Sequence, residues 1–163
     1  MIKRLAYLGL CTSMAMILSW VEVLLPPIYS AIPGIKLGLP NIVIIFLLYR
    51  FGWKDAAAVS LVRICLVAML FGTPMTLAYS IAGGVLSLLV MAILKRINIF
   101  SSIGVSVAGG VFHNIGQILM AVILLGTAEI AYYLLVLAVT GTVAGIFVGI
   151  AGDLLNKKIP KLR

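Results

Sequence analysis

The sequence contains few charged residues and very few acidic ones. Only 10% of its 163 residues are charged, and only four are Asp or Glu. Soluble domains carry roughly 25% charged residues, whereas this chain is 64% hydrophobic and has a mean hydropathy of +1.28. This composition excludes an ordinary soluble domain and predicts an integral membrane protein.

The residues that catalysis and metal binding require are also scarce. The four carboxylates are scattered along the chain, at Glu22, Asp55, Glu129 and Asp153. They therefore provide no cluster of oxygen ligands for Mg²⁺. The two cysteines, Cys11 and Cys65, have neither metal-ligand spacing nor a disulfide framework around them, and no Walker motif or hydrolase turn is present. We therefore expect a chain that is not an enzyme by itself and that holds no metal and no cofactor.

Long hydrophobic runs dominate what is present. They cover residues 5–25, 37–49, 56–71, 75–94, 103–125 and 131–151. Four of these runs approach or exceed the roughly 20 residues that a helix needs to cross a bilayer, and two are shorter. A membrane β-barrel would instead show alternating segments of about ten residues. The runs predict an all-α membrane protein in which residues 1–163 form a single six-helix transmembrane bundle.

The basic residues predict the orientation of this bundle. If the helices alternate in direction from a cytoplasmic N-terminus, ten of the twelve basic residues fall on the cytoplasmic side. These ten are Lys3, Arg4, Arg50, Lys54, Lys95, Arg96, Lys157, Lys158, Lys161 and Arg163. The positive-inside rule therefore predicts that both termini are cytoplasmic. Topology accounts for most of the net charge of +8, so we expect contact with the lipid bilayer and no nucleic-acid partner.

The first predicted external loop and the second helix are unusual. Residues 26–34 contain three prolines and a glycine, which favour an extended path that serves either as a connector or as a lid. The thirteen residues between Lys36 and Arg50 would span only about 20 Å as a helix. We expect this short helix to begin near Pro40 and Asn41, at membrane depth, with its positive end facing outside. Lys36 is then either an anion ligand or a side chain that reaches the external headgroups.

Arg63 is the one cation placed inside a predicted membrane helix. It lies eight positions after Asp55, which corresponds to about 12 Å along the helix. A charge at that depth costs at least about 2.5 kcal/mol, so it should face the protein interior and find a partner. Arg63 has either a ligand-binding or gating role, or a structural role. In the structural role it would bind helix-end carbonyls or Glu22.

A polar stripe follows on the fifth predicted helix. Gly110, His113, Asn114 and Gln117 stand at positions i, i+3, i+4 and i+7, and Ser106 and Ala121 extend the row. Such residues can simply join helices, at about 0.6 kcal/mol per bond, or they can line a solvated binding cavity. Taken together, the candidate substrate-binding residues are Lys36, Asn41, Arg63, His113, Asn114 and Gln117.

Rows of small residues predict close helix contacts. Gly141, Gly145 and Gly149 are four residues apart on the last predicted helix, which is typical of tight helix packing. Weaker rows on the first helix pair Gly9 with Ser13 and Cys11 with Ala15. Either kind of row can pack within the bundle or against another membrane protein.

Three stretches of the chain resemble a known family over nearly its whole length. They are "IPGIKLGLPNIV", "YRFGWKDAAAVSLVRICLVAMLFGTPMTLAYSIAGG" and "FHNIGQ", and they are similar to the small bacterial Gx transporter family, which is labelled heptaprenyl diphosphate synthase component I. More broadly, six short helices with a long first external loop resemble the substrate-binding S components of energy-coupling factor (ECF) transporters.

The resemblance to S components implies a function and partners. Such subunits lie in the bacterial cytoplasmic membrane, capture a vitamin or similar micronutrient from outside, and pair with a transmembrane coupling subunit and two ABC ATPases. It implies that the first loop acts as a lid and that small residues of the first helix meet the coupling subunit. The nearest matches here are Gly9, Cys11, Ser13 and Ala15.

Three hypotheses for the function remain at this stage. The first is an S component that binds a small anionic or amphipathic micronutrient or precursor. The second is a non-catalytic membrane subunit of an isoprenoid or quinone pathway, which would associate with a soluble prenyl synthase. The third is an autonomous proton-coupled carrier in which His113 exchanges the proton.

Overall fold

The computed structural model describes residues 2–24 and 38–159 of the chain, and within them all regular structure is helical. This confirms the predicted all-α class. The elements are α1 (Ile2–Leu24), α2 (Asn41–Arg50), α3 (Trp53–Phe71), α4 (Pro74–Ile97), α5 (Ser102–Leu125), the 3₁₀ helix η1 (Ala128–Tyr133) and α6 (Leu134–Lys158).

Four segments are long and apolar enough to cross a membrane: α1, α4, α5 and the combined stretch Ala128–Lys158. They correspond to the four long runs of the sequence, so the chain is a multi-pass membrane protein. α3 has 19 residues but carries Lys54, Asp55 and Arg63, and α2 has only 10 residues, about 15 Å of helix. The short second helix is thus confirmed, whereas six full spans and the cytoplasmic placement of both termini remain predictions.

Several helix boundaries differ from those expected. α2 begins at Asn41, as the position of Pro40 predicted, and not at the start of the hydrophobic run at residue 37, because Gly38 has a positive φ of 85° and Pro40 forms the N-cap. α3 begins at Trp53 rather than at residue 56, and Asp55 lies in its first turn, where a carboxylate is favoured by the helix dipole. α6 extends to Lys158 rather than to residue 151, and its polar last turns include an ion pair of 2.7 Å between Lys157 and Asp153.

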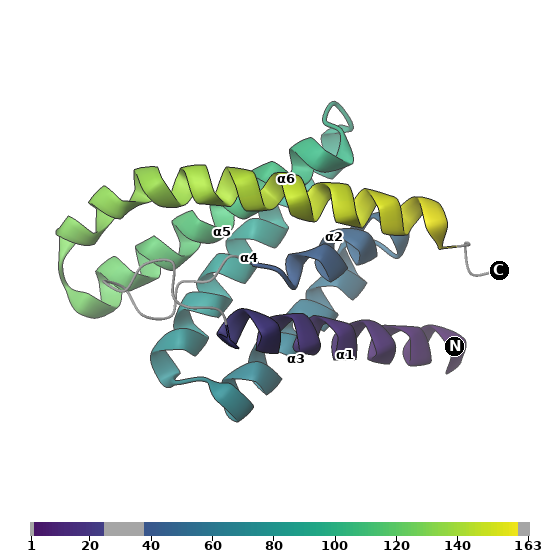
Figure 1. Ribbon diagram of the computed structural model, residues 1–163, viewed down its shortest axis with the longest axis horizontal. Coiled ribbons are helices and arrows are strands. Elements are labelled where there is room, and N and C mark those ends of the chain that lie inside the picture. The colour runs from purple at the N-terminus through teal and green to yellow at the C-terminus, as the bar shows by residue number, and fades with distance from the viewer. Residues whose placement is uncertain (1, 25–37, 160–163) are drawn as a thin grey trace.

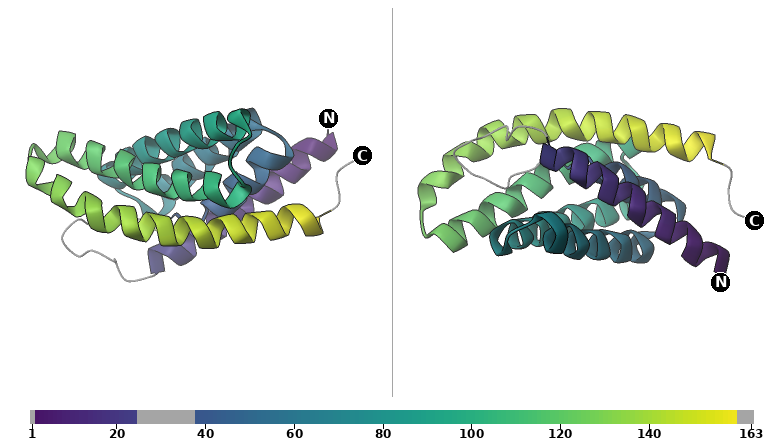
Figure 2. Two further views of the ribbon diagram at one scale, coloured as in Figure 1. Left: turned by 90° about the horizontal axis from the view of Figure 1, so that it is seen from above. Right: turned by 60° about the horizontal axis from the view of Figure 1, so that its bottom comes forward.

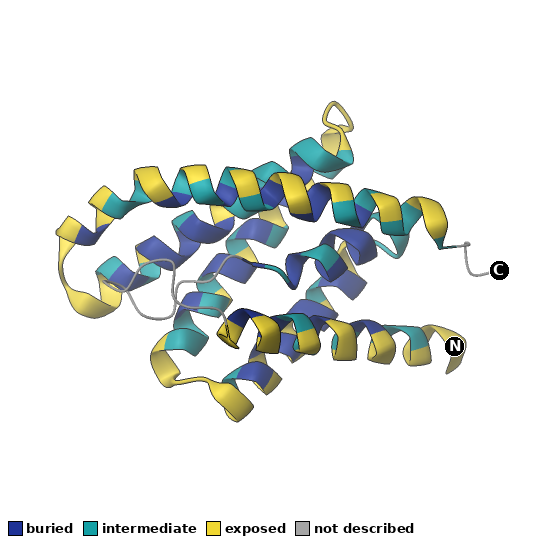
Figure 3. Cartoon of the chain, in the orientation of Figure 1, coloured by how far each residue is buried: buried dark blue, intermediate teal, exposed yellow. Residues whose placement is uncertain are grey.

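The arrangement places α2 in the middle of the bundle (Figure 1). α5 packs between α4 and α6, while α2 contacts α1, α3 and α6. The two further views in Figure 2 show α5 and α6 lying side by side along most of their length. In Figure 3 α2 is largely buried, whereas the outer faces of α1 and α6 are exposed. Because apolar side chains cover those outer faces, they suit contact with lipid.

At one end of the bundle, polar contacts connect the ends of neighbouring helices. Arg4 forms an ion pair with Asp55 at 2.6 Å, and the Ser102 hydroxyl donates a hydrogen bond to Asp153 at 3.1 Å. Two backbone carbonyls also accept hydrogen bonds, each of 2.5 Å: that of Ile159 from the Arg50 guanidinium, and that of Leu48 from the Lys95 ammonium. The starts of α1, α3 and α5 therefore meet the ends of α2, α4 and α6. We call this the basic end; it carries Lys3, Arg4, Arg50, Lys54, Lys95, Arg96, Lys157 and Lys158. Lys161 and Arg163 lie outside the described residues.

Glycines allow α5 and α6 to approach backbone to backbone. A Cβ atom added to Gly145 would lie 2.6 Å from the Val107 Cα, and one added to Gly149 would lie 2.9 Å from the Ile103 Cα. A Cβ on Gly141 would lie 2.7 Å from the amide nitrogen of Asn114. The small-residue row of α6 therefore packs within the bundle, against α5.

Candidate functional site

The polar stripe of α5 lies inside the bundle. His113, Asn114 and Gln117 expose 5%, 4% and 0% of their surface, and Ser106 exposes 2%. The stripe borders α4 on one side and α6 on the other, because α5 packs between them. Its members are thus divided between two different neighbours.

Asn114 is directed toward α6. Its amide nitrogen donates a hydrogen bond of 2.6 Å to the Leu137 carbonyl, and the same atom approaches Gly141. This hydrogen bond joins two membrane helices. It is the helix-joining role that the sequence offered as one of two possibilities for the polar stripe.

His113 and Gln117 are directed toward α4. A Cβ atom on Gly83 would lie 3.0 Å from His113 Nδ1 and 2.9 Å from Gln117 Cγ, so both side chains press against the backbone of α4. Neither the nitrogen nor the oxygen of the Gln117 amide has a hydrogen-bond partner among the described residues. In a close-packed interior, most amides have at least one such partner, which makes Gln117 a candidate ligand contact.

The start of α2 also lies next to the polar stripe, near His113. A Cβ atom on Gly38 would lie 3.9 Å from the His113 ring and 2.9 Å from the amide nitrogen of Asn41. Asn41 itself is buried. Two of the predicted binding residues, Asn41 and His113, are therefore brought together around Gly38.

Glu22 is a residue of this site that the sequence did not single out as a binding group. The backbone N–H groups of Gly38 and Leu39 both donate to its carboxylate, the second at 3.3 Å. The carboxylate thus occupies the positive start of α2, where an anion is favoured. The available signal was an isolated acid near the C-terminal end of the first membrane helix, which requires a partner.

Arg63 is a buried counter-charge to Glu22. Arg63 and Glu22 each expose 7% of their surface, and the Glu22 carboxylate attracts the Arg63 guanidinium electrostatically. The Arg63 Nε has no hydrogen-bond partner within residues 2–24 and 38–159. Glu22 therefore balances part of the charge of Arg63, and the Nε–H group of Arg63 is left to donate to a further group. Lys36 and the Pro-rich loop 26–34 lie outside the described residues.

A small cavity borders the start of α2 and the polar stripe of α5. A cavity of about 10 Å³ lies between Gly38 and Asn41 at the start of α2, Ser106 and Gly109 on α5, and Gly145 on α6. About 10–15 Å³ of this kind of volume holds a single water molecule. This cavity is therefore too small for a ligand larger than a water molecule.

The two small-residue rows of α1 face in opposite directions. Cys11 and Ala15 expose 4% and 0% of their surface and pack in the core. Gly9 and Ser13 are exposed, and nothing lies within 4 Å of a Cβ atom added to Gly9. Only the Gly9–Ser13 row is therefore accessible to another protein.

These features define a class of protein: a multi-pass helical membrane protein with a polar cluster buried among its helices. The family model described as heptaprenyl diphosphate synthase component I matches residues 11–155. This covers most of the chain, which therefore belongs to that family, as its resemblance to the Gx transporters indicated. The family description denotes one component of a multi-component system. No curated protein and no solved structure matches the chain.

Proposed function

We propose that the chain is the substrate-binding S component of an ECF-type importer in the bacterial cytoplasmic membrane. It would capture a small anionic or amphipathic micronutrient or precursor from outside and work with a transmembrane coupling subunit and two ABC ATPases. The observation that carries the proposal is the Gln117 amide, which is fully buried and has no hydrogen-bond partner among the described residues.

A buried amide without a partner is costly. Leaving its donor and acceptor unsatisfied costs about 1–3 kcal/mol, and water in the bilayer interior is scarce. A bound ligand that offers both an acceptor and a donor would remove this cost. Gln117 lies beside His113, which in turn lies near the start of α2, so one small molecule could contact all three.

The surroundings favour a ligand with negative charge. Arg63 and the Asn41 amide are donors, and Lys36 would add a cation from the first loop, whereas the N–H groups of Gly38 and Leu39 already bind the Glu22 carboxylate. Asn114 is assigned a supporting role in this proposal, because its amide nitrogen already binds Leu137 on α6. The accessible Gly9–Ser13 row on α1 is the proposed contact with the coupling subunit.

Replacing Gln117 by leucine is expected to reduce bound ligand without loss of stability. The protein, purified from its own membranes in mild detergent, would be examined by native mass spectrometry for a small-molecule adduct. Gln117→Leu should lower the bound fraction about tenfold, while its melting temperature stays equal or rises because an unpaired amide is removed.

Asn114→Leu is the matched control. It removes the hydrogen bond to Leu137, so we expect a stability loss of about 1–2 kcal/mol with the adduct retained. Retention of the adduct by Gln117→Leu, or its loss only in Asn114→Leu, would contradict the placement of the ligand.

The family description favours one alternative function, a non-catalytic membrane subunit of an isoprenoid pathway. Mass spectrometry of the proteins that co-purify with the tagged chain separates the two functions. Two ABC ATPases and a second membrane protein would support the importer. A soluble prenyl synthase without ATPases would support the isoprenoid pathway and would refute the importer.

A further inference from the structure

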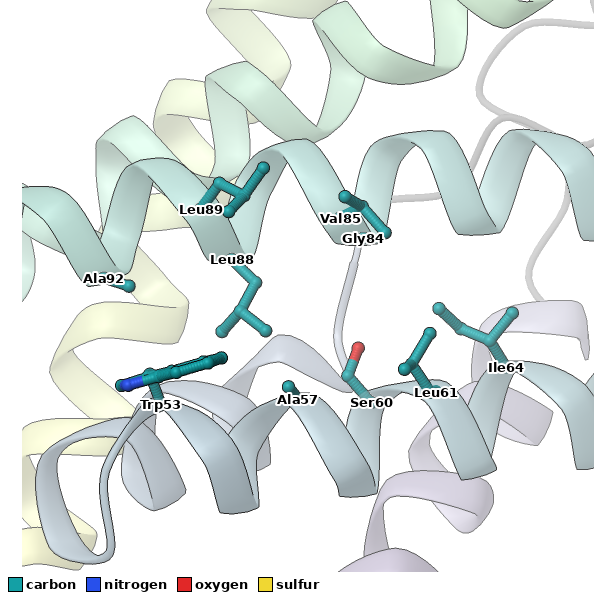
Figure 4. A pocket seen from close by; sticks show the side chains of 10 residues that line it. All are labelled: Trp53, Ala57, Ser60, Leu61, Ile64, Gly84, Val85, Leu88, Leu89 and Ala92. Atoms are coloured by element: carbon teal, nitrogen blue, oxygen red, sulfur yellow. The ribbon is translucent and has the colours of Figure 1, made fainter.

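A second cavity lies between α3 and α4, and Figure 4 shows the residues that line it. Its volume is about 170 Å³, and none of the candidate substrate-binding residues lines it. The lining is hydrophobic apart from Ser60 and the ring nitrogen of Trp53. We call this cavity the α3–α4 groove; it includes Trp53, Ser60, Ile64, Gly84, Leu88 and Ala92.

The groove opens on the outer surface of the bundle. Of its lining residues, Trp53, Leu61 and Leu89 expose 58%, 48% and 55% of their surface. Exposed apolar side chains on a membrane helix face lipid. The occupant of the groove therefore enters from the bilayer.

The length of the groove matches one leaflet. Trp53 and Ile64 are eleven positions apart on α3, which is about 16 Å of helix. Half of a hydrocarbon core of roughly 30 Å is about 15 Å. The groove thus runs from the membrane surface, where Trp53 and the basic end lie, to the middle of the bilayer.

Two cations stand where the groove reaches the membrane surface. The Lys54 ammonium lies 5.9 Å from the centre of the Trp53 ring, and Arg96 is exposed one turn beyond Ala92 on α4. Neither forms an ion pair within the part of the chain that the structure describes. Their neighbours are already engaged, since Arg4 pairs with Asp55 and Lys95 binds the Leu48 carbonyl.

We propose that the α3–α4 groove binds one acyl chain of an anionic phospholipid, whose phosphate lies beside Lys54 and Arg96. A hydrocarbon chain fits the apolar lining, whereas a polar micronutrient would find only Ser60 and Trp53 to bond. A partner helix is about 10–12 Å wide, so only single side chains of it could enter a cavity of about 170 Å³. Anionic phospholipids are the negatively charged lipids that a basic membrane face meets. This proposal is independent of the proposed importer function.

Tryptophan fluorescence provides the test, because the chain has only two tryptophans, Trp20 and Trp53. The Trp20→Phe variant leaves Trp53 in the groove as the reporter. It would be reconstituted into vesicles that contain phosphatidylcholine or phosphatidylglycerol with brominated acyl chains, which quench nearby tryptophan. Brominated phosphatidylglycerol should reach half-maximal quenching of Trp53 at a mole fraction about tenfold lower than brominated phosphatidylcholine, since two surface cations contribute to its binding. Equal quenching by the two lipids would overturn the proposal.

Matched variants locate the two parts of the lipid. In the Trp20→Phe background, Lys54→Gln combined with Arg96→Gln should abolish the preference for phosphatidylglycerol. Lys157→Gln combined with Lys158→Gln, the same charge change at the basic end but away from the groove, should preserve it. Ala92→Phe, which fills the groove, should weaken quenching by both lipids.

Three further results would overturn the assignment. One is a preference that survives the loss of Lys54 and Arg96. Another is an equal preference reported by Trp20 in the Trp53→Phe variant, because Trp20 lies on the exposed face of α1. The third is displacement of brominated phosphatidylglycerol by farnesyl phosphate at lower mole fractions than by unlabelled phosphatidylglycerol, which would assign the groove to an isoprenoid chain.

Discussion

Replacing Arg63 by methionine is expected to lower the free energy of unfolding by about 1–3 kcal/mol, because the buried Glu22 carboxylate would lose its attraction to the Arg63 guanidinium. Arg63 and Glu22 are both buried and attract each other electrostatically. Methionine fills similar space but leaves the Glu22 carboxylate buried without this counter-charge. The loss would be measured as the change in equilibrium unfolding of the protein in mixed detergent and SDS micelles.

A double-mutant cycle distinguishes this pairing from a separate role for Arg63. In Glu22→Gln combined with Arg63→Met, the glutamine oxygen still accepts from the N–H groups of Gly38 and Leu39, and no charge is left behind. We therefore expect the double variant to be more stable than Arg63→Met alone. Effects that add within about 0.5 kcal/mol would show that the two side chains act independently. Arg96→Met serves as the control, because Arg96 is exposed and its loss should change stability by no more than about 0.5 kcal/mol.

The cycle also bears on ligand binding. If Arg63 served Glu22 alone, the double variant would retain any bound adduct, whereas a ligand that uses Arg63 would be lost in both variants. Glu22 occupies the anion position at the start of α2, so an anionic ligand that binds there must compete with it or share Arg63. Native mass spectrometry of the double variant therefore distinguishes a loss of ligand binding from a loss of stability.

The sequence predicted the helices well because their signals are local. Hydrophobic length distinguished the four long segments from the shorter ones, and pairs of basic residues marked the helix ends that gather at one end of the bundle. Pro40 correctly predicted where α2 begins, whereas the hydrophobic run starts four residues earlier because it continues through Gly38. A hydrophobicity pattern cannot predict that Gly38 has a positive φ, which is incompatible with a helix at that residue.

The contacts of the site could be predicted only in part. Helical spacing correctly grouped His113, Asn114 and Gln117, but spacing does not reveal which helix lies on each side of the stripe. Asn114 therefore turned out to bind α6, while the other two face α4. The bond between Glu22 and Gly38 joins residues 16 positions apart across the Pro-rich segment, and no periodic pattern predicts such a contact.

The rows on α1 show the same limit. Residues two positions apart on a helix point about 200° apart, so the Cys11 and Gly9 rows must face nearly opposite sides. The sequence offered both rows for docking because it did not indicate which side the bundle covers. The structure buries Cys11 and Ala15 and leaves Gly9 and Ser13 exposed.

These glycines allow a second large effect to be predicted with a matched control. A Cβ atom added to Gly110 would lie well under 3.0 Å from the Gly141 carbonyl oxygen and 3.4 Å from the Gly145 Cα. Both are backbone atoms of α6, which cannot rotate away as a side chain could, so the two helices must separate. Gly110→Ala is therefore expected to lower stability by about 1–3 kcal/mol, although alanine favours the helical conformation by about 1 kcal/mol over glycine.

Gly9→Ala makes the same chemical change at a position where no atom lies within 4 Å of the new methyl group. Only the helix propensity then acts, so its melting temperature in detergent should equal or exceed that of the wild type. The two variants should thus shift the melting temperature in opposite directions. If Gly110→Ala proved as stable as Gly9→Ala, α5 and α6 would not be in backbone contact. His113 and Gln117 would then not be held against α4 by close packing of α5 on α6, and the proposed site would lose its structural basis.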